Sequence, residues 1–137
     1  MKCRFLTSWT YRRAYGRLLN KIISKVNATE EFWEIDYEMD MLWRLGDKGA
    51  FNALIVYCMI LLRDDKAWYN PKEAMIMLES LAEEDYSPAQ CLFGMLKFNG
   101  AKDIETDKIS GLYWIRKAAE GGSPEAQAFI KMRSEGC

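Results

Sequence analysis

The 137-residue sequence contains no histidine, only three prolines and no CxxC pair among its four cysteines. Without histidine, the chain lacks the commonest general base, the usual partner of a serine or cysteine nucleophile and the commonest metal ligand. Widely spaced cysteines favour reduced thiols over a metal site or a disulfide framework, as is usual in the cytoplasm. Chemistry by carboxylates or lysines stays open, but these absences argue against an enzyme and against a metal or other cofactor.

The sequence also lacks a long apolar run. No stretch approaches the roughly 20 apolar residues that a membrane span needs. Arg12 and Arg13 interrupt the N-terminal segment in which a signal peptide would have its apolar region. Half of the residues are nevertheless hydrophobic and 13% are aromatic, which indicates a folded core in place of intrinsic disorder. Because proline is also scarce, we expect one helical domain. Since the sequence shows neither a membrane span nor a signal peptide, we expect this domain to be located in the cytoplasm.

The net charge of -1 hides an uneven distribution of charge along the chain. Every charged residue before position 30 is Lys or Arg, whereas every charged residue from 30 to 40 is Asp or Glu. A basic segment of this kind can bind nucleic acid or an anionic membrane surface. Since the acidic neighbour would cancel much of its field at a phosphate backbone, we expect the two segments to lie side by side in one fold. Binding of nucleic acid or of an anionic membrane surface through the basic N-terminal helix is the alternative function.

Apolar periodicity and helix-terminal residues predict seven helices. Residues 33–41 alternate apolar and acidic side chains, which alone would indicate a strand, but Thr29 as a cap and Gly46 as a stop favour a helix. The expected helices span about residues 8–26, 29–45, 50–62, 71–84, 87–99, 107–120 and 124–137. The caps expected for the last four helices are Asn70, Ser87, Thr106 and Ser123.

One pair of residues recurs along the chain, an alanine followed six positions later by a methionine. The three pairs begin at Ala53, Ala89 and Ala126, which are about 36 residues apart. A small residue at a fixed place lets two helices approach to about 8 Å. Hairpins that cannot bury their apolar faces alone stack and share a core, so we expect a single all-α domain. Its expected parts are a divergent N-terminal helical pair (1–46), two hairpins (47–86 and 87–122) and a C-terminal capping helix (123–137).

Two segments, AQCLFGMLKFNG (89–100) and DKISGLYWIRKAAEGGSPEAQ (107–127), resemble the Sel-one-like repeat (SLR), a relative of the tetratricopeptide repeat. The resemblance is specific over residues 87–130. The positions that match the family pattern in order are Ala89, Phe93, Gly94, Asn99, Gly100, Asp107, Gly111, Trp114, Lys117, Ala118, Ala119, Glu120, Gly122 and Ala126.

Other parts of the chain depart from this pattern. Residues 47–86 resemble the repeat more weakly, with Cys58 where the family has glycine and Met77 where it has an aromatic residue. Residues 1–37 do not match. The resemblance implies an α-solenoid, a superhelix of stacked antiparallel hairpins, that binds other proteins and is not an enzyme.

The resemblance also implies where a partner would bind, because the first helix of each hairpin lines the concave face of such a solenoid. With Ala89, Phe93 and Gly94 as core positions, helical geometry turns another stripe of side chains toward that face. Methionine is flexible and polarisable, which suits a surface that accepts a partner. The alternative is that curvature or a terminal helix covers the stripe and makes its methionines core residues. The expected partner-binding residues are Ile55, Met59, Leu62, Cys91, Met95, Phe98 and Met132.

We therefore expect a non-catalytic cytoplasmic module that binds a partner protein on its concave face. Blocking that partner is the simplest action of such a module. An inhibitor, such as an immunity protein that neutralises a cognate toxin or effector, is the specific hypothesis.

Overall fold

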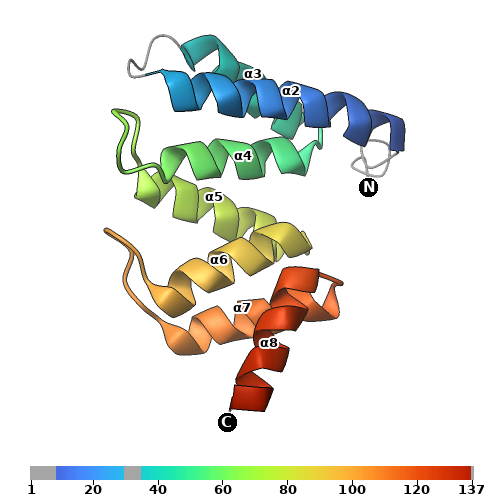
Figure 1. The fold of residues 1–137 in the computed structure, drawn as a ribbon, viewed down its shortest axis with the longest axis vertical. Coiled ribbons are helices and arrows are strands. Elements are labelled where there is room, and N and C mark those ends of the chain that lie inside the picture. The colour runs from blue at the N-terminus through green and yellow to red at the C-terminus, as the bar shows by residue number, and fades with distance from the viewer. Residues whose placement is uncertain (1–8, 30–34, 137) are drawn as a thin grey trace. The chain divides into compact units, whose positions relative to one another are not determined.

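The computed structural model describes residues 9–29 and 35–136. Within these ranges the chain forms seven α-helices, no β-strand and one isolated backbone bridge, between Ala101 and Ile104 (Figure 1). Helices pack mainly against their neighbours in the sequence, which confirms the predicted all-α, repeat-like fold. The helices are α2 (Trp9–Ala28), α3 (Asp36–Asp47), α4 (Phe51–Leu61), α5 (Pro71–Glu83), α6 (Ser87–Asn99), α7 (Lys108–Glu120) and α8 (Pro124–Gly136).

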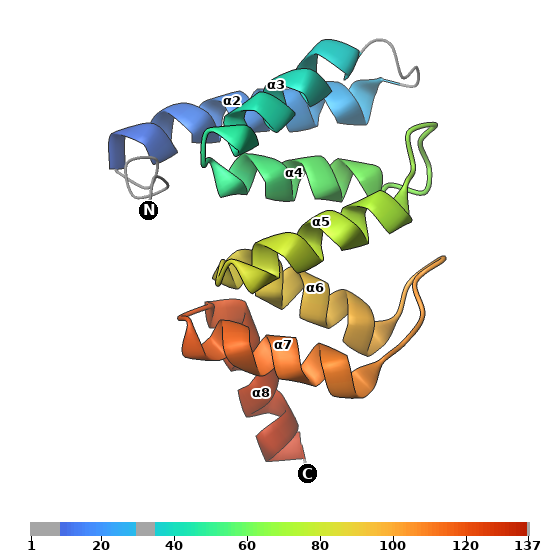
Figure 2. The same ribbon diagram turned by 180° about the vertical axis from the view of Figure 1, so that it is seen from behind.

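The chain divides into two compact units, Met1–Asn70 and Pro71–Cys137. Unit 1 contains α2, α3 and α4, whereas unit 2 contains α5, α6, α7 and α8 (Figure 2). The boundary lies between the two helices of the predicted hairpin 47–86, where proline begins α5. Each unit has buried residues of its own, so each is described by itself.

Helix α3 occupies the segment whose apolar and acidic residues alternate, and confirms that this segment is helical from Asp36 onward. Ile35, Met39 and Leu42 fall at helical spacing and are buried. Tyr37 is exposed on another face of the helix. The alternation therefore reflects a helix with an apolar buried face and an acidic exposed face, because both patterns coincide over a few residues. The first part of the predicted helix, 30–34, lies outside the described residues.

Oppositely charged helices meet in unit 1. The Lys25 ammonium on α2 donates a hydrogen bond to Glu38 Oε2 on α3 over 2.9 Å. Near the end of α3, a Cβ atom on Gly46 would overlap the Leu54 side chain of α4. The basic and acidic segments thus lie side by side at this pair, and a glycine lets α3 approach α4.

The first turn of α7 is capped by a residue that differs from the predicted one. The Asp107 carboxylate accepts a hydrogen bond from the Ser110 backbone N–H over 3.1 Å, so the prediction of Thr106 as the cap was wrong. Aspartate is at least as good a cap as threonine, and its negative charge is also stabilised at the positive end of the helix dipole.

The two Ser-Pro sequences of unit 2 have different roles. Ser123 caps α8 as predicted, because its hydroxyl oxygen accepts a hydrogen bond from the Ala126 N–H over 3.3 Å. Ser87 instead lies within the first turn of α6, whose cap position is Tyr86. The Ser87 hydroxyl donates to the Gly121 carbonyl over 3.2 Å, which ties the beginning of α6 to the end of α7.

Two glycines let α6 and α7 meet backbone against backbone. A Cβ atom on Gly94 would lie 2.8 Å from the carbonyl oxygen of Gly111, and one on Gly111 would lie 2.8 Å from the Phe98 Cα atom. Real Cβ atoms essentially never approach other atoms within 3.0 Å. Because the opposing atoms belong to the backbone, neither position accepts a side chain unless the two helices move apart.

This contact predicts that Gly111→Ala destabilises the protein. Alanine favours a helix over glycine by about 1 kcal/mol, but overpacking at a rigid contact costs roughly 1–3 kcal/mol. We expect a net loss in the free energy of unfolding, measured by urea titration and circular dichroism. Ser80→Ala, at an exposed position of α5, is the control and should change stability by less than about 0.5 kcal/mol. A Gly111→Ala protein as stable as the wild type would contradict the backbone contact.

Candidate functional site

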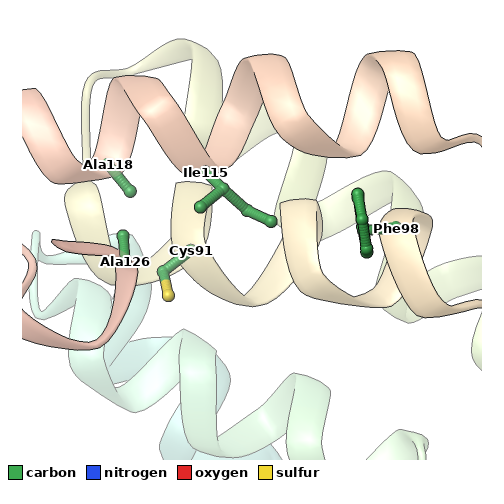
Figure 3. Close-up of a cluster of buried hydrophobic side chains, with 5 residues drawn as sticks. All are labelled: Cys91, Phe98, Ile115, Ala118 and Ala126. Atoms are coloured by element: carbon green, nitrogen blue, oxygen red, sulfur yellow. The ribbon is translucent and has the colours of Figure 1, made fainter. Parts of the chain in front are cut away.

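The residues predicted to bind a partner from α6 lie in the interior of unit 2. Cys91 and Phe98 are each 9% exposed and form a buried cluster with Ile115, Ala118 and Ala126 (Figure 3). The members of this cluster come from α6, α7 and α8. Met95 is partly buried against the same cluster. The stripe on α6 is therefore part of the core. This arrangement is the alternative considered above, in which a terminal helix covers the stripe and makes its residues core residues.

Helix α8 encloses Phe98 in particular. The Phe129 ring stands edge-on to the Phe98 ring, with centroids 5.2 Å apart and an interplanar angle of 82°. The Arg133 guanidinium of α8 lies 4.9 Å from the Phe98 centroid, and the Lys108 ammonium of α7 lies 4.3 Å from it. Two cations and one aromatic ring thus lie against this side chain, which at 9% exposure has little apolar surface left for a partner.

The Cys91 thiol is a structural group in this core. Burial raises its pKa above the ordinary value; a hydrogen bond with Ser123 opposes this change, and the Glu125 carboxylate adds to it. A raised pKa keeps the group as a thiol at neutral pH, whereas the thiolate is the reactive form. This position therefore contributes packing and not nucleophilic chemistry.

The two other repeated methionines have a different environment. Met59 on α4 is 51% exposed, and Met132 on α8 is 72% exposed. Ile55 and Leu62, one turn to either side of Met59, are half-buried. Because these positions share one face of α4, they form an apolar strip on unit 1.

A small pocket of about 100 Å³ extends this strip between α2 and α4. Ile23, which is 37% exposed, and Met59 stand at its edge. Val26, Val56 and Ile60 complete its apolar lining. We name Ile23, Ile55, Met59 and Leu62 the α4 surface.

The polar rim of the pocket is held in place by hydrogen bonds. The Arg63 guanidinium donates to Asn27 Oδ1 over 2.7 Å and to both carboxylate oxygens of Asp65 over 3.1 Å. The hydrogen bond from Arg63 lowers the pKa of the Asp65 carboxyl group. The cation at the rim is thus paired with an anion, and the pocket beside it is apolar.

The loop that follows α4 is fixed to the end of α2. Lys66, only 9% exposed, donates from its ammonium to the Thr29 carbonyl over 2.8 Å and lies 5.9 Å from the Trp68 ring. Trp68 is 4% exposed. A buried lysine of this kind has no clear sequence signal, since its acceptor is a backbone carbonyl 37 residues away.

A second hollow, which no sequence pattern indicates, lies in unit 2 between α5, α6 and the loop between α6 and α7. Its volume is about 430 Å³. We name it the α5–α6 groove; its lining residues are Pro71, Lys72, Met75, Ile76, Glu79, Phe93, Lys97, Asp103, Ile104 and Glu105.

Helix α2 carries the basic side chains on which binding of nucleic acid or of an anionic membrane surface would depend. Arg17 and Lys21 are exposed, whereas Lys25 forms the ion pair with Glu38.

No helix among the described residues has the length and apolar character to cross a membrane. In the same part of the chain, no group of three or more side chains could hold a metal ion.

Comparison with protein-family models, with curated proteins and with solved structures gave no match. The resemblance to the Sel-one-like repeat therefore stays a prediction from the residues.

Because the stripe contains both buried and exposed side chains, replacing them with alanine should lower the free energy of unfolding by different amounts. Phe98→Ala removes a buried ring and should lower the free energy of unfolding by roughly 3–5 kcal/mol. Met132→Ala removes a side chain that is 72% exposed and should change it by less than about 0.5 kcal/mol. Urea unfolding followed by circular dichroism measures both. Equal effects of the two substitutions would show that α8 does not cover α6 as described.

Proposed function

We propose that the protein is a non-catalytic, cytoplasmic protein-interaction module that binds a partner protein through the α4 surface. The observation that carries this proposal is the half-exposed Met59 at the edge of an apolar pocket. Apolar side chains that gather on a surface favour association, because fully burying an exposed one contributes about 1.5–3 kcal/mol and burying the rest of a half-buried one contributes part of that. A methionine at the centre of such a surface adapts its shape to the partner.

The rim of the pocket supports binding of a protein in a fixed orientation. Arg63 is held by Asn27 and Asp65, so its position does not have to be ordered when the partner arrives. A preformed rim reduces the entropy lost on binding. The apolar strip would supply affinity and the ordered polar groups would set the orientation.

Inhibition is the specific form of this function that we propose to test. A surface that covers part of another protein blocks that part without any chemistry of its own. Neutralisation of a toxin or effector by an immunity protein is one such case, and it rests on the resemblance to the Sel-one-like repeat.

Nucleic acid or an anionic membrane surface is the alternative ligand. Exposed Arg17 and Lys21 on α2 favour it, whereas the pairing of Lys25 with Glu38 reduces the available charge. Such binding would weaken steeply with increasing salt, because it depends on counterion release. Binding through the α4 surface is mainly apolar and would depend on salt only slightly.

The proposal predicts that Met59→Glu abolishes partner binding and keeps the fold. Wild-type protein, Met59→Glu and Ile109→Glu serve as baits in extracts of the native cell, with quantitative mass spectrometry of the bound proteins. Ile109 is 87% exposed on α7, outside the α4 surface, so it is a matched control. We expect a protein that the wild type and Ile109→Glu retain and that Met59→Glu loses. Its purified form should bind Met59→Glu at least about tenfold more weakly, which corresponds to 1.4 kcal/mol.

Circular dichroism of the same samples separates binding from folding. A Met59→Glu protein that unfolds would place Met59 in the core and contradict the proposal. Retention of the same partners by all three baits would contradict it as well.

A further inference from the structure

The α5–α6 groove is a preformed slot whose lining is half apolar and half charged. Met75 and Ile76 of α5, Phe93 of α6 and Ile104 of the loop supply its apolar lining. Its volume of about 430 Å³ falls within the range of ordinary ligand sites. Ile76 is 63% exposed, so a large apolar side chain stands at the edge of the groove in contact with water.

The loop wall of the groove is held by backbone hydrogen bonds. The N–H groups of Ala101 and Ile104 donate to each other's carbonyl groups, over 3.2 Å and 3.0 Å. The Asp107 N–H donates to the Lys97 carbonyl over 2.7 Å, which fixes the end of the loop to α6. The groove therefore has its shape before anything binds, which lowers the entropic cost of filling it.

Helix α5 presents a charge pattern along this groove that is complementary to itself. Lys72, Ile76 and Glu79 line the groove at positions i, i+4 and i+7, so they share one face of the helix. Lys72 and Glu79 are exposed and lie about 10 Å apart along the helix axis, with Ile76 between them. A second copy of this face, turned by 180°, places lysine opposite glutamate at both ends and Ile76 opposite Met75, which also lines the groove, beside the two-fold axis.

We propose that this face of α5 is the two-fold interface of a homodimer. The α5 helices of two copies lie antiparallel, and Ile76 of each copy enters the α5–α6 groove of the other. Lys72 of each copy pairs with Glu79 of the other, as an isologous interface requires. The proposal does not depend on the proposed function, because the α4 surface belongs to unit 1 and the groove belongs to unit 2.

The remaining charges of the groove set the strength of this dimer. The Lys97 ammonium lies 5.4 Å from the Phe93 centroid, on the α6 wall. Asp103 and Glu105 line the loop wall, where the negative charge of their carboxylates offsets the positive charge of Lys72 and Lys97. Because the interface consists of one helix face and one groove, we expect a weak dimer with a dissociation constant in roughly the micromolar range.

Sedimentation velocity of the full chain across a range of concentrations tests the dimer. Wild-type protein should pass from monomer to dimer, and Ile76→Glu should remain monomeric. Ile109→Glu makes the same change at an exposed position outside the groove and should dimerise like the wild type. Met59→Glu should also dimerise normally, so failure of the proposed function and failure of the dimer are distinguishable.

Charge reversal tests the antiparallel register. Lys72→Glu and Glu79→Lys should each weaken the dimer at least about tenfold, because each brings like charges together twice. The double variant carrying both changes should restore it. An equimolar mixture of the two single variants should form a heterodimer, since each copy then supplies the charge that the other lacks.

Three results would overturn the proposal, provided that circular dichroism shows the variants folded. The first is a wild-type protein that remains monomeric up to about 0.5 mM, which is well above the micromolar range expected for a weak interface. This result would overturn the proposal even if another protein were found to bind at Ile76. The second is a dimer that Ile76→Glu leaves unchanged. The third is a dimer that the single charge reversals weaken and that neither the double variant nor the mixture restores.

Discussion

The backbone contact between Gly94 and Gly111 is the constraint on which the packing of unit 2 depends. Because α6 and α7 meet without intervening side chains at this point, Ile115 of α7 reaches the same cluster as Cys91 of α6. Ala126 of α8 joins that cluster and is fully buried. A wider separation of α6 and α7 would leave this cluster open, and α8 would lose the surface on which it packs.

The same packing gives the repeated methionines different environments. Met95 faces the buried cluster because α8 covers α6, whereas Met59 is half-exposed and Met132 is largely exposed. A recurring spacing along the chain thus identifies equivalent positions on equivalent helices. It does not identify a binding surface, because the exposure of each position depends on which helix lies beside it.

The sequence contained enough information to predict the helices and most of their ends. Apolar periodicity is a local property, and Ser123 caps its helix through residues only three positions away. Thr106 and Asp107 are neighbouring cap residues of similar strength, so the sequence alone did not distinguish them. The same limit applies to Ser87, whose hydroxyl bonds to a carbonyl 34 residues away.

The candidate surfaces depended more strongly on tertiary contacts. The exposure of Met59 agrees with the expected stripe. Predicting that Phe98 is buried would have required knowledge of where α8 packs. The α5–α6 groove joins side chains that are far apart in the sequence, such as Ile76, Phe93 and Ile104. No periodicity within a single helix predicts such a groove, because its shape comes from the loop and the interhelical contact.

Methionine oxidation tests most directly whether packing by α8 separates the repeated methionines into core and surface positions. The folded protein is treated with dilute hydrogen peroxide, and peptide mass spectrometry gives the rate of sulfoxide formation at each methionine. Met59 and Met132 should oxidise several times faster than Met95, and the three rates should converge in urea-unfolded protein. Oxidation of Met95 as fast as Met132 in the folded protein would contradict the account.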